Sequence, residues 1–165
     1  MLSVIIQTRD NEAELARTLA TLVGAAVEGL VREVIVCDTG SRDATLKVAD
    51  HAGCRMVSDG IGEAVRTAKG EWLLLLEPGA RLVDGWIDPV VAHLTRQTMP
   101  ARFTRTRSSR PRFLARVFST VLAEGLLIRK AQAASRLRPG VDAESIGRGL
   151  ASRRIAAGIT PAEGR

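Results

Sequence analysis

The chain has 165 residues, of which 45% are hydrophobic and 25% are charged. A chain of this length buries roughly 70% of its unfolded surface and forms one domain, and its composition excludes a globally disordered or collagen-like protein. No apolar run reaches the roughly 18 residues of a membrane-spanning helix, and the first residues lack the basic start of a secretion signal. We therefore expect a single domain over residues 1–165 that stays in the cytoplasm.

The net charge of +6 hides a division between two halves of the chain. Residues 1–92 contain nine Lys or Arg and 14 Asp or Glu. Residues 93–165 contain 15 Lys or Arg and four Asp or Glu. A surplus of one sign attracts partners of the other sign. The two halves are therefore expected to face different partners or each other.

Short apolar runs alternate with helical patterns through the first 90 residues, which is typical of β-α units that build a parallel sheet. The predicted strands cover residues 2–8, 33–38, 55–58 and 72–76. The predicted helices begin after Asn11 and cover residues 43–52 and part of 60–69. Asn11 and Glu14 have the spacing of a capping box, in which each side chain would bond the backbone at the start of the first helix.

The pattern weakens in the second half of the chain. Residues 102–112 hold five arginines among Ser, Thr and Pro, and they predict an exposed loop. Helical spacing of apolar residues returns over residues 113–122. Beyond it we expect a strand over residues 125–129 and helices over residues 131–137 and 142–157.

Side chains able to bind a ligand follow three of the predicted strands. Thr8 ends the first strand, Asp38 ends the second, and Glu77 follows the fourth. Ligands of parallel α/β sheets bind beyond the carboxyl ends of the strands. We therefore expect Thr8, Asp38 and Glu77 to converge on one edge of the sheet.

Three stretches with this order carry a family resemblance. Residues 3–12 read Ser-Val-Ile-Ile-Gln-Thr-Arg-Asp-Asn-Glu, residues 38–43 read Asp-Thr-Gly-Ser-Arg-Asp, and residues 68–76 read Ala-Lys-Gly-Glu-Trp followed by four leucines. They resemble the opening strand, the Asp-x-Gly-Ser-x-Asp motif and the strand before the metal motif of the family 2 glycosyltransferases, which have the GT-A fold. Residues 141–150 more loosely resemble the segment that carries the family's acceptor base.

The resemblance implies a GT-A-like, or Rossmann-like, α/β fold with a mostly parallel sheet flanked by helices. Residues 1–92 would be the nucleotide-binding half and residues 93–165 the basic, acceptor-side half. The implied activity is transfer of a sugar from a nucleotide-sugar donor to an unknown acceptor. The alternative is a catalytically impaired relative that binds sugar nucleotides or serves as a scaffold.

By the same resemblance, the nucleotide would be bound by Thr8, Asp38, Gly40 and Arg66. A carboxylate such as Asp38 can accept hydrogen bonds from a base or a ribose hydroxyl. The other interpretation of Asp38 is structural, because an aspartate before Gly-Ser commonly caps its own turn. Both interpretations stay open at this point.

Two departures from the family pattern concern the metal and the base. The motif that usually offers two carboxylates for Mg²⁺ or Mn²⁺ is reduced here to Glu77, which weakens metal binding without excluding it. At the position of the acceptor base the chain has Ala143, so Asp142 or Glu144 would have to act in its place. The two cysteines and two histidines show no spacing that indicates another cofactor.

The arginines of the second half suggest an anionic partner. A phosphate-bearing or glycan acceptor, or lipid phosphate at the inner face of a membrane, would suit them. A solvated basic loop, or a nucleotide-binding domain with a nucleic-acid-binding arm, are the other interpretations. The scarcity of aromatic residues and the lack of an RNA-binding motif argue against nucleic acid.

Overall fold

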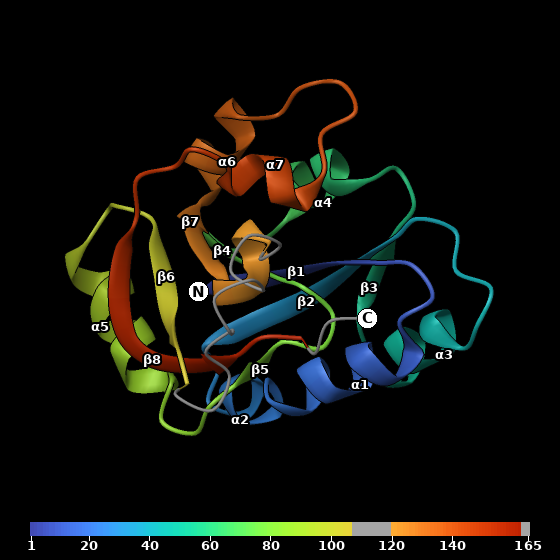
Figure 1. Cartoon of the computed structure of the whole chain (residues 1–165), viewed down its shortest axis with the longest axis horizontal. Helices are drawn as coiled ribbons and strands as arrows, with labels where there is room; N and C mark the ends of the chain where they lie inside the picture. Colours follow the sequence, from blue (N-terminus) through green and yellow to red (C-terminus); the bar gives the residue numbers. More distant parts are fainter. Residues whose placement is uncertain (107–119, 163–165) are drawn as a thin grey trace, which may run out of the picture.

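The computed structural model describes residues 1–106 and 120–162, and within them eight strands form one sheet in the order β3-β2-β1-β4-β7-β6-β8-β5 (Figure 1). The strands are β1 (Leu2–Thr8), β2 (Val31–Asp38), β3 (Arg55–Val57), β4 (Trp72–Leu76), β5 (Arg81–Leu82), β6 (Ala101–Arg105), β7 (Leu126–Arg129) and β8 (Arg153–Thr160). The α-helices are α1 (Glu12–Ala20), α2 (Val23–Val27), α3 (Thr45–His51), α4 (Ile61–Thr67), α5 (Ile87–Arg96), α6 (Lys130–Ser135) and α7 (Ala143–Gly147). A 3₁₀ helix, η2, covers Val121–Glu124. None of the described helices is long and apolar enough to cross a lipid bilayer.

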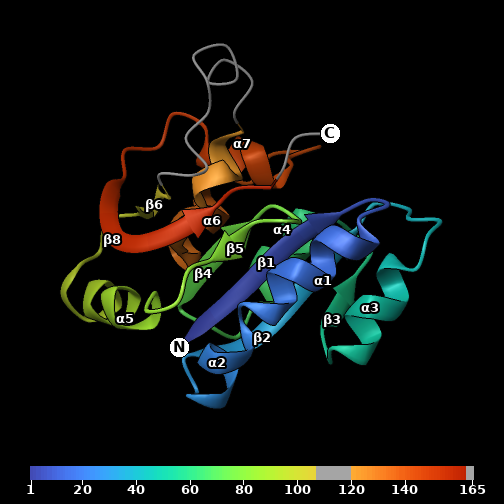
Figure 2. The ribbon, with the colours of Figure 1, turned by 60° about the horizontal axis from the view of Figure 1, so that its bottom comes forward.

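The first half of the chain forms the parallel part of the sheet. Strands β3, β2, β1 and β4 run parallel, and the side chains of β1 alternate between two apolar cores. Val4 and Ile6 pack with α1, α2, α3 and α5, whereas Ile5 packs with α4, α6 and α7 (Figures 1 and 2). Strands covered on both faces are mostly apolar, and such apolar runs are recognisable in a sequence. The predicted α/β fold class, a sheet flanked by helices, is confirmed.

Beyond β4 the sheet becomes mixed. Strand β7 pairs antiparallel with β4 and with β6, whereas β8 runs parallel to β6 and antiparallel to β5. The predicted helix over residues 142–157 is wrong, because it shortens to α7 and is followed by β8. Ile155, Ala157 and Ile159 are buried in alternation with more exposed residues, and this period of two is that of a strand.

The arginine-rich stretch also differs from its prediction. The predicted loop over residues 102–112 begins instead as strand β6, where Phe103 is fully buried. Residues 107–112, and the part of the predicted helix over residues 113–119, lie outside the described residues. The strand predicted over residues 125–129 is confirmed by β7, and the helix after it by α6.

Candidate functional site

The carboxyl ends of β1, β2 and β4 form one edge of the sheet. Thr8 pairs with Asp38 across β1 and β2, and Ile6 pairs with Leu76 across β1 and β4. Glu77, which follows Leu76, therefore lies on the same edge as Asp38. The predicted convergence of these side chains on one rim is confirmed.

Asp38 closes the turn after β2. Its Oδ2 accepts hydrogen bonds from the N–H groups of Gly40 and Ser41, both at 2.9 Å, and its Oδ1 accepts from the hydroxyls of Thr8 at 3.2 Å and Ser41 at 2.5 Å. Partial burial would raise the pKa of Asp38, but the bonds from Ser41, Gly40 and Thr8 outweigh it and hold the pKa below its ordinary 3.8. A carboxylate has about four acceptor sites. The bonds from the turn and from Thr8 therefore occupy them all, and contact of Asp38 with a nucleotide stays a prediction.

Asp38→Ala is expected to lower the free energy of unfolding by about 2 kcal/mol at pH 7, because two turn N–H groups lose their charged acceptor. Since the folded pKa of Asp38 is lowered, its contribution is complete above 3.8 and is lost as the pH falls through the folded value. Urea unfolding at several pH values should show the difference between wild type and variant narrowing below pH 4. The exposed Asp84 offers a control, and Asp84→Ala should change stability by less than about 0.5 kcal/mol. A difference for Asp38→Ala that stays constant down to pH 3 would contradict the prediction.

The start of α1 is bonded to the loop that follows Asp38. The backbone N–H of Asn11 donates to Thr45 Oγ1 at 2.9 Å, and that of Glu12 donates to Asp43 Oδ2 at 3.2 Å. The predicted capping box of Asn11 and Glu14 is wrong, because Asn11 makes no side-chain cap. These long-range bonds replace it, and they fix the two loops of the rim to each other.

Glu77 is contacted by two segments from the second half of the chain. Its Oε2 accepts a hydrogen bond from the Thr120 hydroxyl at 2.6 Å, and its Oε1 accepts one from the backbone N–H of Ala162 at 3.3 Å. Gly79 has φ +94°, and a Cβ added there would lie 3.0 Å from the Cβ of Ala162. Glycine at this position thus permits the close approach of the chain to Glu77.

A cavity of about 230 Å³ opens beside Glu77. It is lined by Gln7, Leu76, Glu77, Pro78, Thr120, Leu122, Asp142, Ala143 and Glu144. The structure therefore brings the predicted metal ligand together with both predicted base residues. No role was expected for Gln7 from the sequence. Its Oε1 accepts a hydrogen bond from the Ala143 N–H at 2.9 Å and joins β1 to α7.

Asp142 and Glu144 both bond to backbone N–H groups. Asp142 is the N-cap of α7, and its Oδ1 accepts from the N–H of Ser145 at 2.8 Å and from the Ser145 hydroxyl. The bond from that hydroxyl contributes most to holding the pKa of Asp142 below its ordinary 3.8. Glu144 accepts the N–H groups of Val121 and Leu122 on separate oxygens. Of these two carboxylates, only Asp142 keeps an oxygen without a hydrogen bond to the described residues.

Arg66 lies in α4, the helix that follows β3. It is exposed in the last turn of α4, and the next residue, Thr67, accepts a hydrogen bond from Arg55 at the amino end of β3. Its guanidinium reaches back over Gly62, where an added Cβ would lie 3.2 Å from Nη1. Contact of Arg66 with a nucleotide therefore stays a prediction.

The residues at the rim suit one mode of divalent-cation binding. No group of three His, Cys, Asp or Glu side chains within residues 1–106 and 120–162 is arranged to hold a metal ion. Mg²⁺, however, is usually bound by one or two carboxylates together with substrate phosphates. Glu77 beside an open cavity fits this phosphate-dependent mode and does not fit a site built by protein ligands alone.

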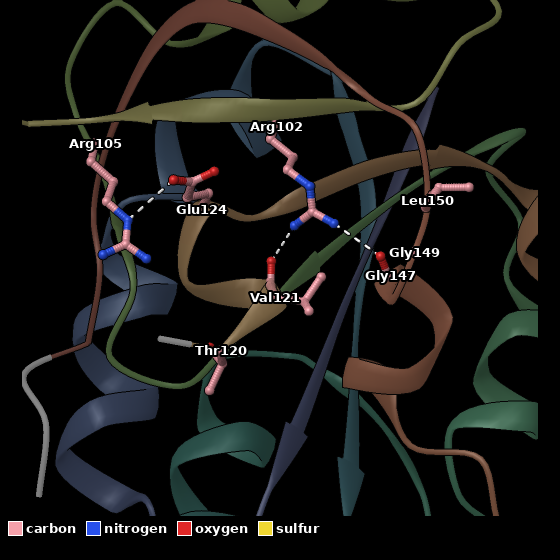
Figure 3. A pocket seen from close by; sticks show the side chains of 8 residues that line it. All are labelled: Arg102, Arg105, Thr120, Val121, Glu124, Gly147, Gly149 and Leu150. Carbon is pink, nitrogen blue, oxygen red and sulfur yellow. Dashed lines mark hydrogen bonds and ion pairs between the residues drawn. The ribbon is translucent and has the colours of Figure 1, made fainter. Parts of the chain in front are cut away.

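A second cavity of about 300 Å³ shares Thr120 with the first (Figure 3). It is lined by Arg102, Arg105, Thr120, Val121, Glu124, Gly147, Gly149 and Leu150. Arg102 Nε donates to the Ser152 hydroxyl at 3.1 Å, and its two Nη atoms donate to the carbonyls of Val121 and of Gly147, the latter at 3.0 Å. Contrary to the predicted exposed loop, Arg102 is partly buried and joins β6 to η2 and α7.

Comparison with known families gives one match over most of the chain. The model of glycosyl transferase family 2 matches residues 3–138. A TPR repeat-containing protein from Synechococcus elongatus is 33% identical over an alignment of 95 residues, and the match covers 52% of this chain and 22% of that protein. The chain thus spans only about a fifth of that relative.

Solved structures share the fold at low sequence identity. Glucosyl-3-phosphoglycerate synthase from Mycobacterium tuberculosis, in complex with Mn²⁺, UDP and glucosyl-3-phosphoglycerate, is 18% identical and gives a TM-score of 0.67 over 100% of this chain and 72% of that one. TarS from S. aureus is 16% identical, with a TM-score of 0.67 over 94% of this chain and 57% of its own. These likenesses show a GT-A-type architecture for the described sheet and helices.

Proposed function

Because this chain belongs to glycosyl transferase family 2, we propose that it transfers a sugar from a nucleotide-sugar donor to an acceptor hydroxyl at the rim of its sheet. The observation that carries the proposal is the shared edge of Asp38 and Glu77, with a cavity between β4 and α7 beside Glu77. The carboxyl edge is where parallel α/β sheets bind ligands. The fold and the position of the carboxylates thus support the same reaction.

The nucleotide is proposed to bind at the turn after β2. Thr8 and Asp38 present hydroxyl and carboxylate oxygens there, and Gly40, with φ +98°, leaves the backbone open to a close approach. A ribose hydroxyl or base N–H would replace one of the hydrogen bonds that Asp38 now accepts. The Mycobacterium tuberculosis enzyme was crystallised with UDP, which supports uridine diphosphate as the first nucleotide to test.

Glu77 is the proposed ligand of a divalent cation, whose remaining ligands would come from the diphosphate. The Mycobacterium tuberculosis enzyme binds Mn²⁺ or Mg²⁺ together with UDP, which supports such a cation here. When bound, the cation supplies positive charge that stabilises the departing diphosphate. Glu77 would exchange the Thr120 hydroxyl or the Ala162 N–H for it.

Asp142 is the proposed general base. The acceptor oxygen forms its bond to the anomeric carbon while that carbon separates from the diphosphate, and the acceptor proton must pass to a base within hydrogen-bond reach. Asp142 lines the cavity and keeps one oxygen available, whereas both oxygens of Glu144 accept N–H groups from η2. Glu144 is therefore the second choice.

The acceptor is proposed to carry a phosphate group, either in a small molecule or in a lipid at a membrane surface. The surplus of 15 basic over four acidic residues in 93–165 supports an anionic acceptor. The phosphoglyceric acid bound by the Mycobacterium tuberculosis enzyme also supports an anionic acceptor.

Glu77→Gln is expected to weaken the Mn²⁺-dependent binding of UDP by about tenfold or more, because a neutral amide is a poorer ligand than a carboxylate for a hard cation. Isothermal titration calorimetry with and without Mn²⁺ measures the effect. Glu71→Gln removes the same charge from an exposed site at the amino end of β4 and should leave both affinities unchanged. Wild-type UDP binding that Mn²⁺ does not strengthen would contradict the role of Glu77.

Turnover assays with a panel of nucleotide sugars separate the two candidate functions. Hydrolysis or transfer by the wild type supports the enzyme, and failure to bind any nucleotide would contradict both. Binding without turnover would identify a catalytically impaired relative. Two observations favour this second candidate. Ala143 stands at the position of the base, and both oxygens of Glu144 accept hydrogen bonds from η2.

A further inference from the structure

The cavity of Arg102 and Arg105 adjoins the proposed transfer site without being part of it. Its volume is about 300 Å³, and β6, η2 and the end of α7 contribute its lining (Figure 3). Thr120 lines both this cavity and the cavity at Glu77. A molecule held here by one end can therefore extend its other end toward Glu77.

An irregularity in the sheet accompanies the placement of the two arginines. Side chains three residues apart in a regular strand point to opposite faces. The pairing of β6 with β8 shifts register between Arg102 and Thr104, and both guanidinium groups, of Arg102 and Arg105, reach the same cavity (Figure 3). Irregularities in strand pairing, such as β-bulges, redirect side chains and are frequent beside functional sites.

Arg102 is a partly buried cation whose direct partners are all neutral. Its guanidinium donates to one hydroxyl and two backbone carbonyls, which use three of its five N–H donors. No carboxylate in the described part of the chain lies within ion-pair distance of it. Burial lowers the pKa of Arg102, and nearby glutamates oppose this only from a longer distance. An anion in the cavity would offset the cost of burying this charge.

Glu124 forms ion pairs with two further arginines at or beside the cavity. Glu124 Oε1 lies 3.3 Å from Arg105 Nε, and its Oε2 lies 3.1 Å from Arg154 Nη2. Arg102, which has no ion pair with a carboxylate of the described residues, adds its guanidinium to the same lining. Guanidinium groups gathered in one cavity attract anions.

We propose that this cavity is an anion subsite that binds the phosphate group of the acceptor through Arg102 and Arg105. That the anion belongs to the acceptor rests on the proposed function, whereas binding of the anion itself does not. Guanidinium groups bind phosphate oxygens through strong, geometrically defined hydrogen bonds. The phosphate comes from a soluble molecule or from a lipid head group, and the chemistry of recognition is the same.

Titration calorimetry with glycerol 1-phosphate, in the absence of nucleotide and Mn²⁺, tests the subsite. We expect the wild type to bind, Arg105→Gln to bind about tenfold more weakly, and Glu124→Gln to bind more tightly because the competing carboxylate is gone. Arg138→Gln is the matched control, since Arg138 is exposed and donates to carbonyls of its own turn. Thermal unfolding verifies that each variant is folded.

Sedimentation with phosphatidylglycerol or phosphatidylcholine vesicles distinguishes the two sources of phosphate. Loss of glycerol 1-phosphate binding in Arg105→Gln indicates a soluble acceptor. Binding to phosphatidylglycerol vesicles alone, lost in the same variant, indicates a lipid head group. The proposal is overturned if neither probe binds the wild type or if Arg138→Gln weakens binding as much as Arg105→Gln. UDP titration of the same wild-type sample reports on the proposed function independently.

Discussion

Gly70→Ala is expected to lower the free energy of unfolding by about 3 kcal/mol, and the melting temperature by about 6–12 °C. A Cβ at this position would lie 2.6 Å from the backbone N of Ser3 and 2.9 Å from the carbonyl O of Met1. Both atoms belong to the backbone where β1 begins, so the clash cannot be relieved by rotating a side chain. The Ser3 hydroxyl, which accepts a hydrogen bond from Gly70 N–H at 2.9 Å, would also be displaced.

The damage would reach a polar network that joins β1, β2 and β3 to the segment before β4, at the end of the sheet opposite the rim. Glu33 Oε1 accepts hydrogen bonds from the Ser3 hydroxyl at 2.7 Å and from the Lys69 N–H at 2.6 Å, and its Oε2 accepts one from Arg55 Nε at 3.2 Å. Burial would raise the pKa of Glu33, but the bonds from Lys69, Ser3 and Arg55 hold it below its ordinary 4.5. Moving Ser3 therefore disturbs the register on which the rim depends.

Gly24→Ala is the control for this prediction. Gly24 lies in α2, and an added Cβ would meet no atom within 4 Å. Alanine favours the helix, so the variant should be more stable than the wild type by up to about 1 kcal/mol. Urea and thermal unfolding measure both variants. Equal stabilities of Gly70→Ala and Gly24→Ala would contradict the close approach of β4 to β1.

The parallel half of the fold was predictable because its signals are local. Residues 72–76 form a continuous apolar run that becomes β4 with the predicted bounds, and the strand predicted over residues 2–8 is β1 with the predicted bounds. The convergence of Asp38 and Glu77 followed from one topological rule about strand ends. No information about distant parts of the chain was needed for either prediction.

The second half of the fold depends on contacts between distant residues, which local sequence patterns do not reveal. Strand β8 pairs with β6, about 50 residues earlier. The partners of Glu77 lie 43 and 85 residues away, and Gln7 bonds a residue 136 positions later. The signal for Gln7 was a polar side chain at the end of an apolar strand, but its partner could not be inferred from spacing.

Asp142→Asn is expected to reduce turnover of the nucleotide sugar by about 100-fold or more while leaving UDP binding and the melting temperature nearly unchanged. Asparagine caps a helix as well as aspartate does, so α7 keeps its N-cap and only the negative charge of the base is lost. Steady-state kinetics of the folded variant measure the effect. Turnover at the wild-type rate would exclude Asp142 as the base and transfer the role to Glu144.

The pH dependence of turnover provides a second test of the same role. Because the Ser145 bonds hold the pKa of Asp142 below 3.8, this carboxylate is ionised throughout the neutral range, and the rate should not fall on the acid side until about pH 4. Ser145→Ala removes the hydroxyl that contributes most to the lowered pKa but leaves the Ser145 N–H bond to the carboxylate. The acid limb of the rate profile should therefore move to higher pH in Ser145→Ala, and it should disappear in Asp142→Asn. If Asp142 had only a structural role, the acid limb would be unchanged in both variants. The cap would then affect the stability of α7 and not the protonation state in which transfer occurs.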